Sequence, residues 1–174
     1  MFYRPKGKAV AADVIPYFEN GKYYLFYLKD HRNLEEVGEG CDWQLLVSED
    51  LVHFEEKGIA LERGKQNEQD LYVYTGSVIK KDDTYYIFYT GHNNHIDGAE
   101  KILLATSKDL IHWEKEKDFC FSSNSDELEI NDFRDPFVFY DEKKEEYVMV
   151  LTGRYKNLPL MQYRGALLKA TSKD

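Results

Sequence analysis

Proline and cysteine are scarce in this chain of 174 residues, and its 23 basic residues are outnumbered by 32 acidic ones. Only four residues are proline, which argues against a disordered linker or a low-complexity protein. The two cysteines, Cys41 and Cys120, form neither a Cys-x-x-Cys pair nor a disulfide framework, so we expect a reduced, cytoplasmic protein. The formal net charge is −9, which argues against nucleic acid or an anionic membrane as a partner.

Long apolar runs are missing as well, and none approaches the ~20 residues that a membrane helix needs. The first residues, Met1–Lys8, lack the apolar core of a secretory signal, which agrees with the cytoplasmic expectation. Aromatic residues, by contrast, are abundant at 15% of the chain, with fourteen tyrosines. This composition favours β-strands and also flat contacts with sugars.

Three similar aromatic segments recur along the chain. They begin at Tyr23, Tyr85 and Tyr147, which are separated by two intervals of 62 residues. A turn sequence precedes each of them, and the first, Asn20-Gly21, is typical of a two-residue β-hairpin loop. Units of about 60 residues that contain several short strands predict a β-propeller, in which each unit forms a blade of four antiparallel strands.

Strands are expected in the first unit at residues 13–18, 23–28 and 43–48 and around 53–61, while 63–70 and 126–131 are expected to be loops between blades. We therefore predict an all-β fold in which 1–174 is the N-terminal part of one propeller catalytic domain. The chain would carry about two and a half to three blades. They span about 10–62, 70–118 and 132–174, the last being incomplete, and the remainder of the propeller is expected C-terminal to residue 174.

A second repeat has the pattern Ser-x-Asp-Leu-x-His-aromatic. It occurs at Ser48–Phe54 and Ser107–Trp113, and it begins again at Ser172. A motif that is needed in every blade is structural, because an active site would need it once. Short polar side chains can hold a turn, so His53 and His112 are assigned to the scaffold, packed between blades with the aromatic residue.

Asp13 and Asp135 are expected at equivalent places, each opening the first strand of its unit, and Arg134 precedes the second aspartate. The first strand of each propeller blade lines the central channel, so both carboxylates should face one funnel. The second unit has Tyr74–Ser77 in that place, with hydroxyl groups instead of a carboxylate. Paired carboxylates suit glycoside hydrolysis. The alternative is that both aspartates only cap strand ends.

Four motifs, in order, resemble those of glycoside hydrolase family 32, the β-fructofuranosidases. Phe133-Arg134-Asp135-Pro136 matches the Arg-Asp-Pro motif, and Tyr74–Ser77 is similar to Phe-Ser-Gly-Ser. The stretch Trp43–Phe54 is similar to Trp-Gly-His…Ser-x-Asp-Leu-x-x-Trp, and Tyr89–Gly91 matches Tyr-Thr-Gly. The likeness covers nearly the whole chain.

This resemblance implies a five-bladed propeller and a retaining double displacement on fructose-containing sugars such as sucrose, levan or inulin. Asp13 falls at the position of the nucleophile, and Asp135, with Arg134 beside it, at that of the transition-state stabiliser. The resemblance also implies that Trp43, Tyr74 and Ser77 line the sugar subsite. A carbohydrate substrate is the implied partner, with no metal and no organic cofactor.

The chain departs from the family pattern around Asp13, where only the aspartate of the usual motif is kept. An inverting family 43-like furanosidase or xylosidase, a non-catalytic sugar-binding propeller and a structural propeller therefore stay open as alternatives. The family's Glu-Cys motif, which carries the general acid, is not found, and we expect no general acid in this chain. The glutamates that follow Asp135 lie in a polar turn; they are Glu142, Glu145 and Glu146.

Overall fold

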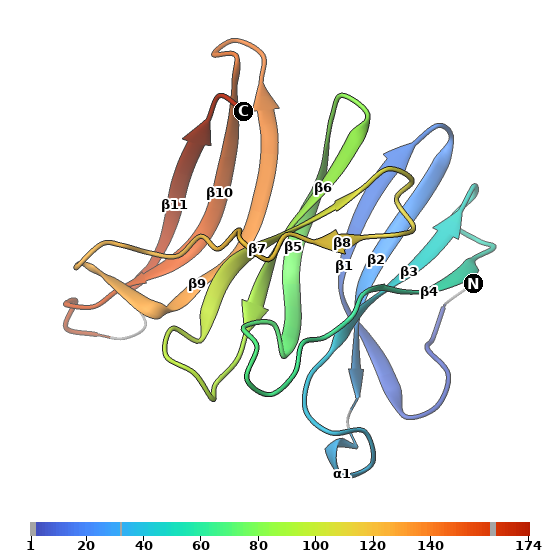
Figure 1. Ribbon diagram of the computed structural model, residues 1–174, viewed down its shortest axis with the longest axis horizontal. Helices are drawn as coiled ribbons and strands as arrows, with labels where there is room; N and C mark the ends of the chain where they lie inside the picture. Colours follow the sequence, from blue (N-terminus) through green and yellow to red (C-terminus); the bar gives the residue numbers. More distant parts are fainter. Residues whose placement is uncertain (1–2, 32, 161–162) are drawn as a thin grey trace.

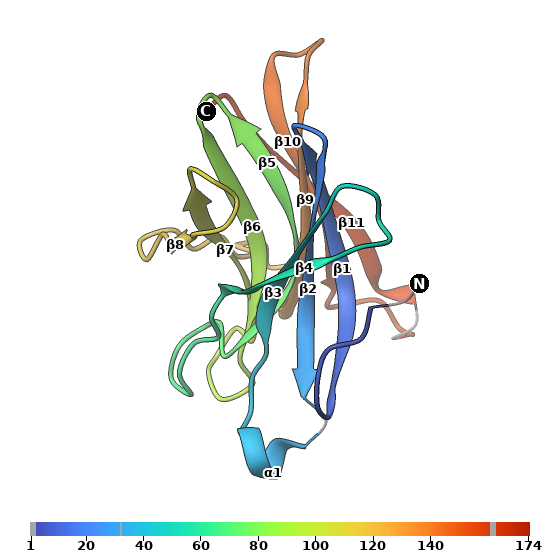
Figure 2. The same cartoon turned by 90° about the vertical axis from the view of Figure 1, so that its right-hand side faces the viewer.

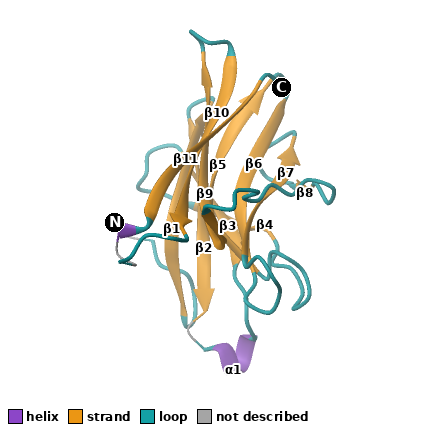
Figure 3. Cartoon of the chain, turned by 90° about the vertical axis from the view of Figure 1, so that its left-hand side faces the viewer, coloured by secondary structure: helices purple, strands orange, loops and turns teal. Residues whose placement is uncertain are grey.

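Strands make up most of the protein in the computed structural model, which describes residues 3–31, 33–160 and 163–174. The strands form three antiparallel sheets that follow one another across the molecule in sequence order (Figure 1). Figure 3 shows how little of the described chain is helical. The prediction of an all-β fold is confirmed.

The first sheet has the strand order β1-β2-β3-β4. It consists of β1 (Ala9–Glu19), β2 (Lys22–His31), β3 (Asp42–Ser48) and β4 (Glu55–Leu61). Between β2 and β3 lies α1 (Leu34–Val37), a single helical turn without buried residues. Each strand pairs with its neighbour in sequence, which is the arrangement of a propeller blade.

The second sheet repeats this order with β5 (Tyr72–Lys81), β6 (Thr84–His92), β7 (Glu100–Ser107) and the short β8 (Glu114–Lys115). Its strands also pair in sequence order, so the unit of the first sheet is repeated strand for strand.

The third sheet contains β9 (Leu128–Asp141), β10 (Glu146–Tyr155) and β11 (Gly165–Ser172), in the order β11-β10-β9. The expected loop at 126–131 is therefore partly wrong, because residues from Leu128 onward already belong to β9. They extend the strand and pair with the end of β10 at Tyr155.

The hairpin between β1 and β2 forms at the predicted turn. Asn20 and Gly21 both have a positive φ, 49° and 78°, and Glu19 pairs with Lys22 across the loop. Two positive φ angles match the twist of the flanking strands, and asparagine and glycine adopt them at little cost. The local sequence thus fixes the register of the first sheet.

The repeated Ser-x-Asp motif forms a turn after β3 and again after β7. In the second copy Ser107 Oγ accepts the amide of Leu110 at 3.0 Å, and Asp109 Oδ1 accepts the amide of His112 at 2.8 Å. The scaffold role is thus supported, but the expected packing of the histidines between blades is wrong. The side chains of His53 and His112 are 78% and 86% exposed, and each ring bonds only to the aspartate of its own motif.

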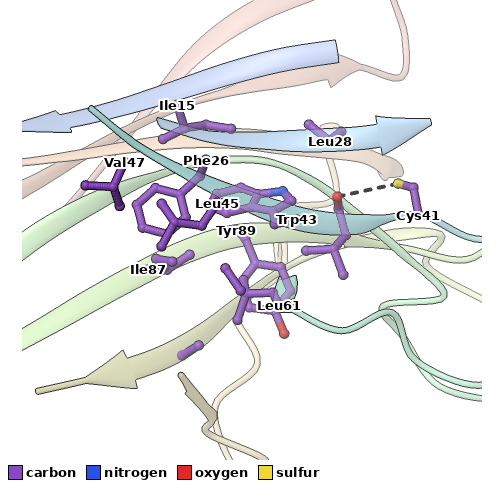
Figure 4. Close-up of a cluster of buried hydrophobic side chains, with 13 residues drawn as sticks. Ile15, Phe26, Leu28, Cys41, Trp43, Leu45, Val47, Leu61, Ile87 and Tyr89 are labelled. Carbon is purple, nitrogen blue, oxygen red and sulfur yellow. Dashed lines mark hydrogen bonds between the residues drawn. The ribbon is translucent and has the colours of Figure 1, made fainter. Parts of the chain in front are cut away.

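Apolar side chains fill the space between the first and second sheets (Figure 4). Trp43 on β3 lies at the centre of this core, with its ring centroid 6.0 Å from that of Phe26 and 6.4 Å from that of Tyr89. Trp113, which ends the second copy of the Ser-x-Asp motif, packs on Phe26 from the neighbouring sheet at 5.8 Å. These contacts hold the first two blades together.

The connections β2–β3 and β6–β7 lie at one end of the sheets, as the position of α1 shows in Figure 2. Hydrogen bonds from one buried side chain hold the segment between the first two sheets at this end. Asn93, which is fully buried, donates to the carbonyls of Gln66 and Glu68 at 2.9 and 2.7 Å. The segment that links the first two blades is therefore held against the β6–β7 connection at this end.

Candidate active site

One extra residue interrupts the pairing of the inner strand at a similar place in each sheet. The irregularities fall at Asp13 in β1, at Thr75 in β5 and at Asp135 in β9. A bulge of this kind turns a side chain out of the regular alternation and is common beside active sites. Asp13 and Asp135 have left-handed φ angles of 42° and 59°, which aspartate tolerates better than most residues. Both lie inside strands, and not at strand starts as the sequence suggested.

These three bulges line one cavity with a volume of about 370 Å³. Four carboxyl groups and one guanidinium group contribute to its wall, so the cavity can form many hydrogen bonds to hydroxyl groups. The lining residues are Ala12, Asp13, Leu28, Asp30, Cys41, Tyr72, Tyr74, Thr75, Glu100, Arg134 and Asp135.

A chain of hydrogen bonds connects the three bulges. Thr75 Oγ1 donates to Asp13 Oδ2 at 2.7 Å. The hydroxyl of Thr90 on β6 donates to the carbonyl of Thr75 at 3.0 Å and accepts the amide of Asp135 at 2.9 Å. The middle sheet thus orients groups of both outer sheets toward the cavity.

The surroundings of Asp135 disfavour the ionised form of its carboxyl group. Burial raises its pKa, Arg134 lowers it, and the negative charges of Glu100 and Asp13 raise it further, so that the pKa lies above its ordinary value. The side chain is still 42% exposed, and Oδ2 lies 3.8 Å from Nε of Arg134. A carboxyl group that is both accessible and destabilised as an anion is suited to accept hydrogen bonds from a sugar.

Glu100 also lines the cavity, but it is a poor candidate for a proton donor. Burial alone would raise its pKa, yet bonds from His92 and Arg134 and the charge of Arg134 hold the pKa below its ordinary value. Glu100 is therefore ionised at neutral pH. The glutamates of the β9–β10 turn, which the sequence analysis also set aside, do not line the cavity.

Tyr74 forms part of the cavity wall, as the sequence analysis expected of this residue. Its ring stacks on the imidazole of His92, with centroids 4.8 Å apart and planes 24° from parallel. Burial raises the pKa of its phenol to about 12, so the hydroxyl stays protonated and can donate. An aromatic face beside hydroxyl-binding groups is a common arrangement in sugar sites.

Trp43 and Ser77, which the sequence places in the sugar subsite, do not line this cavity. Trp43 has no exposed surface, and its Nε1 donates to the carbonyl of Tyr74 at 3.2 Å. Ser77 is 3% exposed, and its Oγ accepts the amide of Val138 at 2.9 Å. Trp43 supports the strand that carries Tyr74, and Ser77 joins the second sheet to the third.

Neither a metal site nor a membrane span is found in the part of the chain that the structure describes. Within residues 3–31, 33–160 and 163–174, no group of three or more His, Cys, Asp or Glu side chains could hold a metal ion. Among the same residues, no helix is long and apolar enough to cross a membrane.

Comparison with known proteins identifies the family to which the chain belongs. The family model "Glycosyl hydrolases family 32 N-terminal domain" matches residues 14–170. The chain belongs to glycosyl hydrolase family 32. Family membership is consistent with paired aspartates on the first and third blades.

Two curated relatives of this family 32 chain carry different names. Sucrose-6-phosphate hydrolase from Escherichia coli is 29% identical over 162 residues, covering 89% of this chain and 32% of the relative. Levanbiose-producing levanase from Bacillus subtilis (strain 168) is 32% identical over 143 residues, covering 78% of this chain and 27% of the relative. The chain thus spans about a third of the length of the curated relatives it matches.

The fold is similar to that of solved family 32 enzymes. Sucrose-6-phosphate hydrolase from Lactobacillus gasseri superimposes with a TM-score of 0.75 at 21% identity, covering 94% of this chain and 32% of that one. Bombyx mori GH32 β-fructofuranosidase BmSUC1 gives 0.72 at 22% identity, covering 94% and 33%. The chain is therefore part of a β-propeller.

Several groups of the cavity are not predicted by the sequence. Thr75 was noted only as a hydroxyl in the segment equivalent to Asp13, although its spacing of 62 residues from Asp13 could have identified it. Thr90 belongs to the Tyr-Thr-Gly motif, but the motif itself indicates no role for its hydroxyl group. No sequence pattern points to Glu100, because its position depends on the packing of the second sheet against the third.

Proposed function

We propose that this chain supplies the nucleophile and a transition-state-stabilising carboxylate to a glycoside hydrolase that acts on fructose-containing sugars. Sucrose, levan and inulin are the candidate substrates. One observation carries the proposal: in a family 32 chain, Asp13 and Asp135 from different sheets line the same polar cavity. The names of the two curated relatives, a sucrose-6-phosphate hydrolase and a levanase, agree with this substrate class.

Asp13 is the proposed nucleophile. Its Oδ2 accepts the hydroxyl of Thr75, which leaves the other carboxylate oxygen to attack the anomeric carbon. The carbon–oxygen bond to the leaving group breaks as the new ester bond forms, and a general acid protonates the leaving oxygen. Water then cleaves the ester, and the configuration of the sugar is retained.

Asp135 and Arg134 are the proposed sugar-holding pair. Hydrogen bonds between sugar hydroxyls and a carboxylate strengthen as positive charge develops on the ring, so they lower the barrier. Tyr74 offers an aromatic face next to them. The three side chains come from β5 and β9 and so present the substrate to Asp13 on β1.

We propose that the remainder of the propeller covers an apolar groove of about 430 Å³ between the second and third sheets, next to β11. Support comes from the equivalent groove between the first and second sheets, where Trp113 packs on Phe26. Phe88, 62 residues after Phe26, lines the open groove. An aromatic residue of a further strand suits this place, and the general acid is expected in the same additional polypeptide.

The proposal is tested by assaying protein that contains this chain on sucrose, levan and inulin, with released fructose as the readout. We expect activity in the parent protein and complete loss in Asp13→Asn, which keeps the shape of the side chain and an acceptor for Thr75. In the parent protein, mass spectrometry after an acid quench should detect one hexosyl adduct on the peptide that contains Asp13. An active Asp13→Asn variant with normal folding would overturn the assignment.

A sugar-binding module without turnover is the second candidate. It is favoured by one observation, namely that no glutamate lining the cavity is suited to donate a proton, since Glu100 stays ionised. In that case calorimetry should detect fructose or levan oligosaccharides binding to the chain, while the anomeric linkage stays intact. Binding that is lost in Asp135→Asn but kept in Asp13→Asn would favour this candidate.

A further inference from the structure

Glu100, the first residue of β7, is the most deeply buried acidic residue of the cavity wall, with 5% of the whole residue exposed. A carboxylate that is removed from water needs partners for both oxygens, or it destabilises the fold. Glu100 meets this need at one oxygen with hydrogen bonds from β9, while its other oxygen lies close to the buried Nδ1 of His92 on β6, which has no hydrogen-bond partner among the described residues.

One oxygen of Glu100 holds the start of the Arg-Asp-Pro segment. Oε2 accepts Nη1 of Arg134 at 2.8 Å and the backbone amide of Phe133 at 3.1 Å. The two bonds fix both the backbone before Arg134 and the direction of its guanidinium group. Arg134 also donates to Asp132 Oδ1 at 2.8 Å, whereas its Nε stays 3.8 Å from Asp135.

The other oxygen of Glu100 faces the aromatic side of the cavity. Oε1 lies 3.5 Å from Nδ1 of His92, whose ring stacks on Tyr74. The side chains of His92 and Glu100 are 13% and 7% exposed, so little solvent separates or screens them. Glu100 therefore contacts both His92, which supports Tyr74 on one wall of the cavity, and Arg134 on the opposite wall.

We infer that Glu100 is a positioning residue that holds Arg134 off Asp135 and fixes the His92–Tyr74 stack, so that the two walls of the sugar site keep one separation. The inference rests on the proposed function, which supplies the sugar. Most of the guanidinium charge is shared with Glu100 and Asp132, which leaves the carboxylate of Asp135 available to substrate hydroxyls.

The charges around the site agree with this role. The groups that face Glu100 are Arg134 and Asp135 on β9, His92 on β6 and Tyr74 on β5, while Asp132 on β9 shares Arg134 and Asp13 on β1 lies across the cavity. The negative charge of Glu100 is one of the causes that raise the pKa of Asp135. Removing this charge, and freeing Arg134 to approach Asp135, should both favour the ionised form of Asp135.

The decisive variant is Glu100→Gln, which keeps an acceptor oxygen for the amide of Phe133. Carbon-13 NMR of the Asp135 carboxyl group then follows its titration in the chain itself, without any assay of activity. We expect the apparent pKa of Asp135 to fall below the parent value and the Nε–Hε signal of Arg134 to move. Asp132→Asn is the matched control, because Asp132 also bonds to Arg134 but pairs on its other side with Arg154 on β10.

A pKa of Asp135 that is unchanged in Glu100→Gln, or lowered only as far as in Asp132→Asn, would overturn the inference. Where hydrolysis is measurable, kcat should fall about ten- to a hundredfold with little change in KM, since misplaced groups weaken the transition state most. If the parent protein hydrolyses none of the sugars, the proposed function fails, while the titration still decides whether Glu100 positions Arg134 and Asp135.

Discussion

The hydroxyl of Thr75 donates a 2.7 Å hydrogen bond to Asp13, so the second blade orients the proposed nucleophile of the first. The two residues are 62 positions apart in the sequence and occupy equivalent bulges. One copy of the repeat thus carries the reacting group, and the next copy carries the group that positions it.

Replacing Thr75 by valine should therefore lower activity while the fold is kept. Valine has nearly the same shape but lacks the donor, which leaves Asp13 with one bond fewer and a free choice of rotamer. We expect kcat to fall about ten- to a hundredfold, as for other misplaced reacting groups. Thr84→Val is the matched control, since the Thr84 hydroxyl accepts only Lys108 at an exposed turn. Equal effects of the two substitutions would contradict the positioning role.

Asp135→Asn should make the protein more stable at neutral pH and inactive. The pKa of Asp135 is raised in the folded state, so ionisation costs stability once the pH rises above the ordinary value of about 3.9. Asparagine avoids this cost because it carries no charge. Thermal unfolding should give a higher midpoint for the variant at pH 7, with the gain shrinking as the pH falls toward 3.9. A lower midpoint at pH 7 would argue that the aspartate is a purely structural residue.

Trp43→Ala should destabilise the chain and act on sugar binding only through the fold. Truncating a fully buried tryptophan costs about 3–5 kcal/mol of unfolding free energy, which urea denaturation can measure. Trp43→Phe keeps much of the apolar volume and should lose less. If either variant unfolds like the parent but has lost its affinity for fructosides, Trp43 belongs to the sugar site after all.

The apolar groove beside β11 should bind a peptide in trans. A synthetic copy of residues 108–117 carries Ile111 and Trp113, which precede β8 and pack against the core between the first two sheets. We expect binding that broadens or shifts the NMR signals of Phe88, Tyr147 and Met149, which line the groove. The same peptide with alanine in place of tryptophan should bind more weakly. Equal binding of both peptides would contradict an aromatic-specific groove.

Local sequence predicted the hairpins and the blades, because turn chemistry and strand alternation act between near neighbours. Asn20-Gly21 could form few other structures, and the repeated Ser-x-Asp motif bonds almost entirely to itself. The common cavity of Asp13 and Asp135 followed from their equivalent places in the repeat. These features depend on patterns that a single sequence displays.

Other features depend on which sheets pack together, and the sequence did not predict them. Trp43 was assigned to the sugar site, but β3 is buried along nearly its whole length on both faces, so alternation could not show where the indole points. Glu100 belongs to no motif, and its partners are His92, which lies opposite it on the neighbouring strand, and Arg134 of the third unit. Such contacts exist only once the blades are assembled.

The bulges at Asp13, Thr75 and Asp135 have a consequence for how this site can change. In each sheet the register recovers within a residue or two, so the side chain at that point can be exchanged without re-pairing the strands. The three bulges are therefore equivalent positions around one common cavity. Two of them carry a carboxylate and the third carries a hydroxyl group. New specificities could arise here by point substitution alone, with the surrounding architecture left untouched.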